Sequence, residues 1–287
     1  MLLALLLTQS ILFHDQPDIS LNVSQFGQCT NTPVYISLHQ DEVDHNRWLK
    51  QTLRTRGGVF VELRQSGQRH VYLNVQGQQI AIDPNRIFSV KGRQRSILQL
   101  NSSLSYDTPV FAKALDKAAL LSQFILKHLN PVNASAIVAM HNNKKGFYND
   151  GQKGLGTVHM SRYQVIANMP KSFVADTYLG DFGLDDLLFI TDNHDFKQLQ
   201  KLGLNLVLQS ANVTTLPELD DGSLSVYAQQ HNVRYLNIET LSVNESSSLD
   251  KTKATNQLAQ QRQMVRSVLD YLDSNCAVTN PQSSRQP

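Results

Sequence analysis

Three polar sites in this 287-residue chain carry residue types that could bind a metal. His39 and Glu42 stand three residues apart, directly after the apolar run 34–38, and His141 and Glu239 each follow another apolar run at once. A polar residue at the end of a buried strand lies at the rim of a sheet, where it can face a ligand. Two histidines and a glutamate are a usual ligand set for catalytic zinc. The sequence therefore predicts a zinc site at His39, Glu42 and His141.

The fourth polar residue, Glu239, is a candidate for proton transfer rather than for metal binding. A zinc ion held by three protein ligands keeps an open position for water, whose pKa it lowers to about 7. A nearby unligated carboxylate can then act as the general base. His45 would extend the run to His-x-x-Glu-x-x-His, but helical positions six apart do not share a face, so we leave it out. His194, which also follows a strand, is a weaker rim candidate.

The apolar runs that must position these residues alternate with segments of helical composition. Strands are expected at 34–38, 59–63, 70–75, 79–82, 136–140, 187–192, 204–208 and 234–238, and helices at 42–56, 109–129, 195–202, 223–231 and 250–272. The polar stretches 15–32 and 90–107 are expected to be irregular. This alternation predicts a three-layer α/β/α fold with a mixed, mostly parallel twisted sheet. Ligands bind beyond the carboxyl ends of such strands, so the candidate residues would meet at one edge.

Taken in order, these motifs resemble the zinc carboxypeptidases and their relatives. The resemblance extends roughly from Val34 to Thr240, through His39-x-x-Glu42, Asp83-Pro84-Asn85-Arg86-x-Phe88, His141 and Asn237-Ile238-Glu239-Thr240. It implies a carboxypeptidase-like fold and a zinc cofactor. Pro84 stands where a leucine or similar residue is more usual, which indicates a divergent branch. The succinylglutamate desuccinylase and aspartoacylase group carries similar motifs.

The resemblance also implies roles outside the metal site. Asn85 and Arg86 match the clamp for the substrate's terminal carboxylate, a task that suits the fork of a guanidinium. Arg69 lies near the place of an arginine that steadies the carbonyl oxygen, with Arg64 as the alternative. Tyr227 is a candidate for the mobile tyrosine of the family's peptidases, with an ordinary packed tyrosine as the alternative.

The acidic pair Asp220-Asp221 reads either as a solvated turn or as an element that biases substrate choice.

Composition describes an ordinary globular protein. Hydrophobic residues make up 41% of the chain, charged residues 17%, and the formal net charge is +2. No dense basic stripe accompanies that charge, so nucleic acid is not expected as a partner. No apolar run is long enough for a stable membrane span.

The first 20 residues read as a leader. Their apolar stretch is the right length for a secretory signal, although no basic residue precedes it and no clean cleavage site follows. Residues 21–287 would then form one zinc-hydrolase domain, located in the periplasm or secreted. In an exported protein Cys29 and Cys276 could form a disulfide, with two buried thiols as the alternative.

These features together predict a zinc carboxypeptidase that cleaves an amide bond next to a free carboxylate. The expected substrate is a small peptide or a cell-wall stem peptide. One alternative is an N-acyl amino acid deacylase of the aspartoacylase or desuccinylase type. Another is a non-catalytic module that binds peptide termini with a degraded metal site. The sequence does not predict the oligomeric state or a choice between L- and D-residues.

Overall fold

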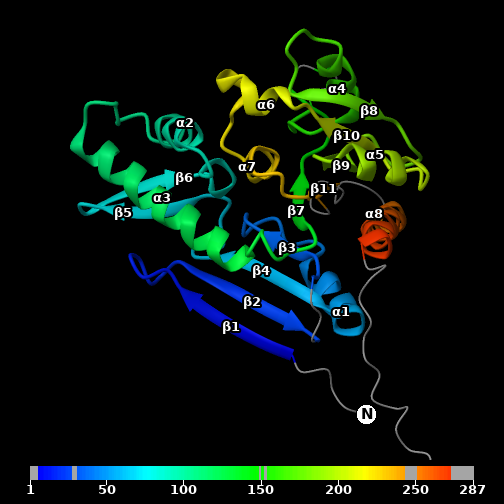
Figure 1. The fold of residues 1–287 in the computed structure, drawn as a ribbon, viewed down its shortest axis with the longest axis horizontal. Helices are drawn as coiled ribbons and strands as arrows, with labels where there is room; N and C mark the ends of the chain where they lie inside the picture. The colour runs from blue at the N-terminus through cyan, green and yellow to red at the C-terminus, as the bar shows by residue number, and fades with distance from the viewer. Residues whose placement is uncertain (1–5, 28–30, 149, 152–153, 243–250, 273–287) are drawn as a thin grey trace, which may run out of the picture.

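The computed structural model describes residues 6–27, 31–148, 150–151, 154–242 and 251–272. Its strands are β1 (Leu6–Leu12), β2 (Ser20–Phe26), β3 (Val34–Ser37), β4 (Gly58–Arg64), β5 (Val71–Val75), β6 (Gln78–Ile82), β7 (Ile137–Asn143), β8 (Val174–Tyr178), β9 (Leu187–Ile190), β10 (Leu206–Gln209) and β11 (Tyr235–Leu241). Nine of them form one sheet in the order β1-β2-β4-β3-β7-β11-β9-β10-β8 (Figure 1). The sheet is mixed, with parallel strands at its centre.

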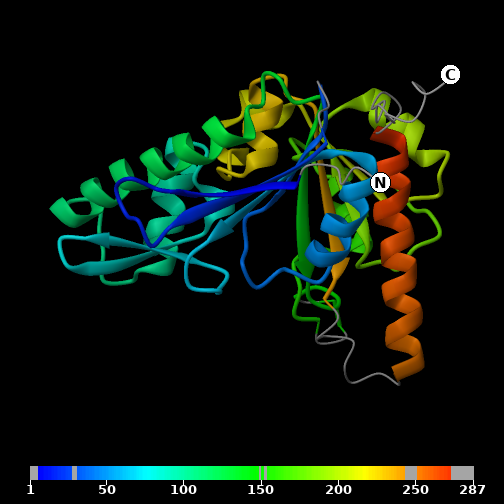
Figure 2. The same cartoon turned by 90° about the horizontal axis from the view of Figure 1, so that it is seen from below.

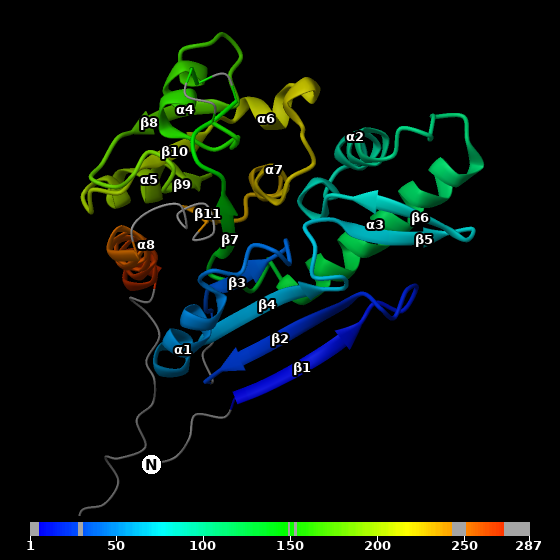
Figure 3. The ribbon, with the colours of Figure 1, turned by 180° about the vertical axis from the view of Figure 1, so that it is seen from behind.

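Helices cover both faces of this sheet. Residues of α1 (Asn46–Arg56), α5 (Asn193–Gln200) and α8 (Lys251–Leu272) pack on one face, and α1 and α8 lie side by side (Figure 2). The other face is covered by α3 (Pro109–Leu129), α4 (Met160–Ala167) and α7 (Leu224–Gln230), and α2 (Val90–Leu100) packs against α3 and β6. The hairpin of β5 and β6 packs beneath α2 and α3 (Figure 3). Shorter helical turns are η1 (Pro84–Arg86), α6 (Asn212–Thr215) and η2 (Pro217–Leu219). This arrangement confirms the predicted three-layer α/β/α fold.

The three strands predicted to carry the site are parallel neighbours. β7 lies between β3 and β11, with Ile137 in register with Val34 on one side and Tyr235 on the other. Every residue of β3 and β11 is buried. Because both faces of these strands are covered by helices, the polar Ser37 and Asn237 are buried along with the apolar majority.

Three segments differ from the sequence-based expectation. Residues 90–100, predicted as a loop, form α2, whose N-cap Ser89 accepts a hydrogen bond from the Gly92 amide and whose Ile97 is buried. Residues 20–26, predicted as irregular, form β2, which pairs with β4. The stretch 157–186, for which no element was predicted, contains α4 and β8. Polar residues outnumber apolar ones in the first two segments, and the two kinds are nearly equal in number in the third, so the burial of a few side chains by tertiary packing decides the structure.

The segment predicted as a leader contributes to the sheet. β1 is its edge strand and pairs antiparallel with β2, and the nearby Phe13 and Ile19 are buried in the core. The predicted boundary at residue 20 therefore does not coincide with a boundary in this structure. Removal of the segment in the cell stays a prediction.

Two further expectations concern the ends of the chain and the membrane. Cys29 and Cys276 lie outside the described residues, so the predicted disulfide stays a prediction. In the described part of the chain, no helix is both long enough and apolar enough to cross a bilayer.

Candidate metal centre and adjoining cavity

The carboxyl ends of the central strands gather the residues predicted to form the site. Glu239 on β11 is the register partner of His141 on β7, and partners on adjacent strands point to the same face of a sheet. His39 follows the end of β3, and Glu42 lies in the turn that leads to α1. All four side chains are buried. Strand direction therefore brings together residues that are far apart in sequence.

His39, Glu42 and His141 form one compact cluster of possible ligand atoms. His39 Nδ1 lies 3.1 Å from His141 Nδ1 and 3.1 Å from Glu42 Oε2. His141 Nδ1 lies 2.7 Å from the same glutamate oxygen. Two ligand atoms that are each about 2.05 Å from a tetrahedral ion are about 3.3 Å apart. The triangle is therefore close to the size that zinc requires.

The ring nitrogens of the two histidines also suit a cation. The Nδ1 atoms of His39 and His141 face each other, so at most one of the two can carry a hydrogen in this contact. His39 Nε2 lies 2.9 Å from Asp83 Oδ1 and can donate its hydrogen there, which leaves a lone pair on Nδ1. Among the described residues, His141 Nε2 is buried without a hydrogen-bond partner. Donor types, distances and lone pairs therefore fit a zinc ion held by both Nδ1 atoms and by Glu42.

The charges in this cluster are strongly coupled. Burial lowers the pKa of His39, but the carboxylates of Glu42 and Asp83 together outweigh it and raise that pKa to about 9. Burial raises the pKa of Glu42, but His141 and His39 outweigh this effect and hold that pKa well below its usual range. The two carboxylates thus favour a positive charge at His39, which a divalent cation bound to the ring would supply in place of the proton.

Asp83 supports the cluster from outside, a role that the sequence analysis did not assign. Its Oδ1 accepts a hydrogen bond from the Asn85 amide at 2.8 Å, in addition to the contact with His39. Burial raises the pKa of Asp83, but His39, Arg86 and Arg69 outweigh this and hold that pKa below its usual range. A carboxylate on the far nitrogen of a ligating histidine fixes its tautomer and orientation. The signal was present in the sequence, since Asp83 begins the Asp-Pro-Asn-Arg motif.

Replacing Asp83 with Asn is expected to lower the affinity for zinc by about 10- to 100-fold. The amide keeps the size of the side chain and an acceptor oxygen, but it removes the negative charge that supports His39. Competition for zinc with a chromophoric chelator measures the change. Asp220→Asn, the same substitution at a carboxylate that accepts from Ser89 instead, is the control. Equal affinities of the wild type and Asp83→Asn would contradict this role.

Glu239 has the environment of a group that exchanges protons. Its Oε1 accepts a hydrogen bond from Asn237 Nδ2 at 3.1 Å. Burial raises the pKa of Glu239, and the charge of Glu42 adds to this effect, while His141 opposes it. A raised carboxyl pKa lies closer to neutral pH, where the group can both accept and release a proton.

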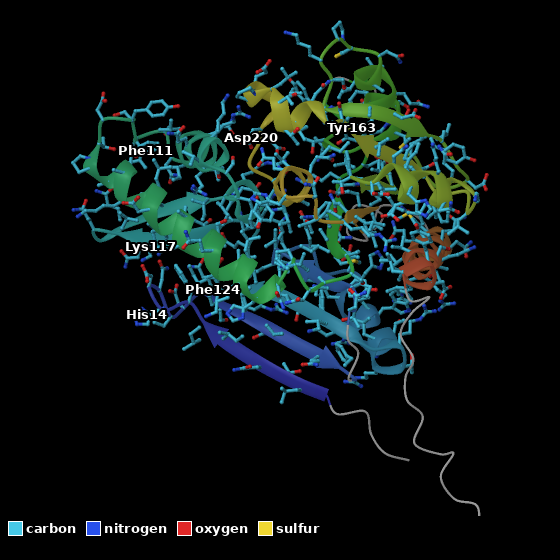
Figure 4. All side chains as sticks on the ribbon, viewed as in Figure 1. His14, Phe111, Lys117, Phe124, Tyr163 and Asp220 are labelled. Atoms are coloured by element: carbon cyan, nitrogen blue, oxygen red, sulfur yellow. The ribbon has the colours of Figure 1, made fainter. Side chains whose placement is uncertain are left out.

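A cavity of about 460 Å³ opens beside Glu239. Its floor is formed by alternate residues of β11 together with Phe189 of β9, the register partner of Asn237. Figure 4 labels Tyr163, which lines the cavity from α4, and Asp220, which lies next to the lining residue Asp221 near α2. The volume is typical of a site for a small molecule. The lining includes Glu239 but not the three metal-ligand candidates, so of these four residues only Glu239 borders the cavity.

Asn85 and Arg86, predicted to bind a carboxylate, line the same cavity as Glu239. The Oδ1 atom of Asn85 accepts a hydrogen bond from the Leu224 amide at 3.1 Å. Arg86 Nη1 lies 3.0 Å from Asp221 Oδ2 and donates to the Asn85 carbonyl at 3.2 Å. The structure therefore brings the predicted clamp and the predicted base to one cavity.

Arg69, rather than Arg64, contacts the metal-ligand cluster. Arg69 Nη1 pairs with Glu42 Oε1, and its Nη2 lies 4.0 Å from Asp83 Oδ2. Arg64 instead pairs with the buried Glu62 at 2.8 Å. Arg69 therefore holds the second oxygen of Glu42 and leaves Oε2 directed at the histidines.

Tyr227 is not among the residues that line the cavity. Its ring stacks on His231, with centroids 4.0 Å apart, and packs against Phe88, as expected for the packed tyrosine considered as the alternative; the role of a mobile tyrosine stays a prediction. Tyr163 lines the cavity instead, and its hydroxyl donates to the Thr157 carbonyl at 3.3 Å. No sequence motif marks Tyr163, because it lies on α4, a helix that the sequence did not predict.

Neither of the other two histidines considered in the sequence joins the cluster. His45 Nε2 lies 3.1 Å from Thr240 Oγ1, in agreement with its omission from the ligand set. His194 follows β9, which runs antiparallel to β11, so it lies at the opposite edge of the sheet. The rim position considered for His194 is therefore wrong.

The loop that carries Arg86 is pressed closely against residues 216–224. A Cβ atom on Gly92 would lie 2.2 Å from Gly222 Cα and 2.6 Å from the Arg86 carbonyl oxygen. The Phe88 amide donates to the Gly222 carbonyl at 2.9 Å. Only a residue without a side chain fits at Gly92, and this close approach fixes the backbone of the clamp.

Gly92→Ala is therefore expected to lower the free energy of unfolding by about 1–3 kcal/mol, as overpacking does elsewhere. It should also raise KM, because the added methyl group displaces the backbone of Arg86. Urea unfolding and steady-state kinetics measure the two effects. Gln94→Ala on the same helix is the control. A Gly92→Ala protein with unchanged stability and unchanged KM would contradict the close contact.

No protein-family model matches the sequence, and no curated protein matches it in sequence. Among solved structures, the chain is similar to a succinylglutamate desuccinylase from Silicibacter sp. TM1040, with 11% sequence identity and a TM-score of 0.39. The similarity covers 94% of this chain and 65% of that one, so the chain spans about two thirds of its length.

Proposed function

We propose that the chain is a zinc-dependent hydrolase that cleaves an amide bond next to a free carboxylate. One observation carries the proposal, which is the convergence of His39 Nδ1, His141 Nδ1 and Glu42 Oε2 beside a cavity that Glu239 and Arg86 line. Amide hydrolysis requires an electrophilic catalyst, a proton carrier and a means of holding the substrate. The cluster, the buried carboxylate and the guanidinium have the chemistry for these tasks.

The metal site provides the electrophile in this proposal. When bound, zinc polarises a carbonyl group and makes water more acidic. His39, Glu42 and His141 would hold the ion, while Asp83 and Arg69 fix the orientation of His39 and Glu42. We also assign Arg69 to the carbonyl oxygen of the substrate, supported by its contact with the metal-ligand candidate Glu42.

Glu239 moves the proton. Its carboxylate takes a proton from the attacking water and delivers it to the nitrogen of the leaving amine. The Asn237 amide holds Oε1 of Glu239, so Oε2 is the atom that exchanges the proton. The raised pKa of Glu239 supports this role, because it lies closer to neutral pH, where the group can accept and release a proton.

Asn85 and Arg86 anchor the free carboxylate of the substrate. The planar fork of Arg86 can pair with both oxygens of a carboxylate. Both residues line the wall of the cavity, which supports binding of that carboxylate, and of the residue that bears it, in the space beside Glu239. We propose that this hydrolase is a carboxypeptidase that acts on small peptides. If residues 1–20 are a leader, the protein is periplasmic or secreted, and the peptides are cell-wall stem peptides.

A deacylase that acts on N-acyl amino acids is the second candidate, since the same cavity would hold its product. A matched pair of substrates with one shared leaving residue separates the two activities. We expect the zinc-loaded protein to release phenylalanine faster from a blocked dipeptide that ends in phenylalanine than from N-acetylphenylalanine. The opposite order would make it a deacylase. Zinc binding without release from any substrate of either class would favour the non-catalytic module.

A further inference from the structure

The predicted carboxylate clamp already holds a carboxylate that belongs to the protein. Arg86 Nη1 lies 3.0 Å from Asp221 Oδ2, and both residues line the cavity that contains Glu239. An aspartate side chain carries the same functional group as the expected substrate. A residue of an acidic turn therefore stands where the substrate's own carboxylate should bind.

The backbone around Asp221 is fixed by contacts on both sides. Ser89 Oγ lies 2.8 Å from Asp220 Oδ1, and Gly222 is packed against Gly92 without room for a side chain. The other oxygen of Asp221, Oδ1, accepts a hydrogen bond from the Ser223 amide at 2.9 Å. These contacts hold the loop that carries Asp221 and direct its carboxylate at Arg86. The ion pair is therefore set by the packing of the loop.

The ion pair itself is open to exchange. The side chains of Arg86 and Asp221 are each 41% exposed, and the contact uses a single nitrogen of the guanidinium. An arriving carboxylate can use two nitrogens, which is the stronger geometry. Since exposed ion pairs are weak, competition from Asp221 should reduce substrate affinity by a small factor rather than abolish binding.

We propose that Asp221 is an internal competitor for Arg86, which the carboxylate of the substrate displaces when it binds. This inference rests on the proposed function and names a residue that sets the affinity of the same site. The Asp221 carboxylate lowers the affinity of every ligand whose own negative charge must pair with Arg86. It lowers the affinity of a neutral ligand less, because a neutral ligand does not bind the guanidinium through a charge. Asp221 therefore determines affinity for the anionic group without touching the reacting atoms.

Asp221→Asn is the direct test, because it keeps the acceptor for the Ser223 amide and removes the charge. The probes are phenylalanine, as both enantiomers, and phenylalaninamide, which lacks the carboxylate; phenylalanine is a product in either candidate reaction. Binding to the zinc-loaded protein is measured by calorimetry. We expect phenylalanine to bind about two- to five-fold tighter to the variant, with a smaller change for the amide.

Glu218→Gln is the matched control, since Glu218 is a second carboxylate in the lining of the cavity. It removes one negative charge without changing the partner of Arg86, so it should tighten phenylalanine binding less than Asp221→Asn does. Weaker binding by Asp221→Asn would overturn the proposal and make Asp221 a positioning residue for Arg86. Equal binding by wild type and variant would overturn it as well, while the proposed function would stand. No binding of phenylalanine to either protein would overturn the carboxylate clamp, and the role of Asp221 with it.

Discussion

Glu239→Gln is expected to lower kcat by about 10²- to 10⁴-fold, the usual contribution of a general acid–base group. The amide cannot accept the proton from water or deliver it to the leaving nitrogen. The substitution keeps the size of the side chain and an oxygen that can accept from Asn237. Zinc content, folding and the affinity for phenylalanine should therefore change little. Stopped-assay kinetics on zinc-loaded protein, with metal analysis of the same samples, measure the effect.

The pH dependence of the wild type adds a second readout for Glu239. The carboxylate must be ionised to accept a proton, so kcat/KM should fall as the pH falls through its pKa. Because burial raises that pKa, the acidic limb should lie above the range of an ordinary glutamate. Glu239→Gln should lose this limb. A fully active Glu239→Gln protein, or one with the same acidic limb as the wild type, would show that another group carries the proton.

His141→Ala is expected to remove the metal and, with it, activity. The wild type should bind about one zinc ion per chain, as one three-ligand site requires. Loss of one imidazole leaves only His39 and Glu42 in the cluster. The variant should therefore copurify with almost no zinc and show no turnover above background. Metal analysis by mass spectrometry and a hydrolysis assay measure the two effects.

Thermal unfolding separates loss of metal from loss of fold in this experiment. Zinc that binds the native state raises Tm, so a chelator should lower the Tm of the wild type and leave that of His141→Ala unchanged. His194→Ala, a substitution of an exposed histidine at the opposite edge of the sheet, is the control and should keep its zinc. Full zinc content in His141→Ala would rule out the proposed ligand set.

The sequence predicted most of the central fold because the signals there are local. The runs 34–38, 136–140 and 234–238 are mostly apolar, with Ser37, Arg234 and Asn237 as the exceptions, as expected of strands covered on both faces. Each ends in a polar residue, and the parallel direction of α/β strands brings those ends to one edge. His39, Glu42, His141 and Glu239 could therefore be placed together before any coordinates were known. The arrangement depends on chain direction more than on fine packing.

Elements with mixed composition could not be predicted in the same way. α2 and α4 bury only a few side chains each, so their structure depends on what packs against them. The direction of β9 also carries no local signal, because a strand has the same alternation in either direction. The wrong position expected for His194 follows from the direction of β9. Tyr163 was not recognised because it lies on α4.

By itself the sequence determined the chemical types at the candidate site, since the possible metal ligands and the proposed base are marked by residue type and by position after a strand, and the proposed clamp by its motif. Only the tertiary structure decided which partners they have. Asp83 bonds to His39, Arg69 holds Glu42, and Asp221 pairs with Arg86 across a contact that Gly92 and Gly222 permit. These partners lie on segments that are distant in sequence and that packing brings together. No local pattern of residues predicts that contact.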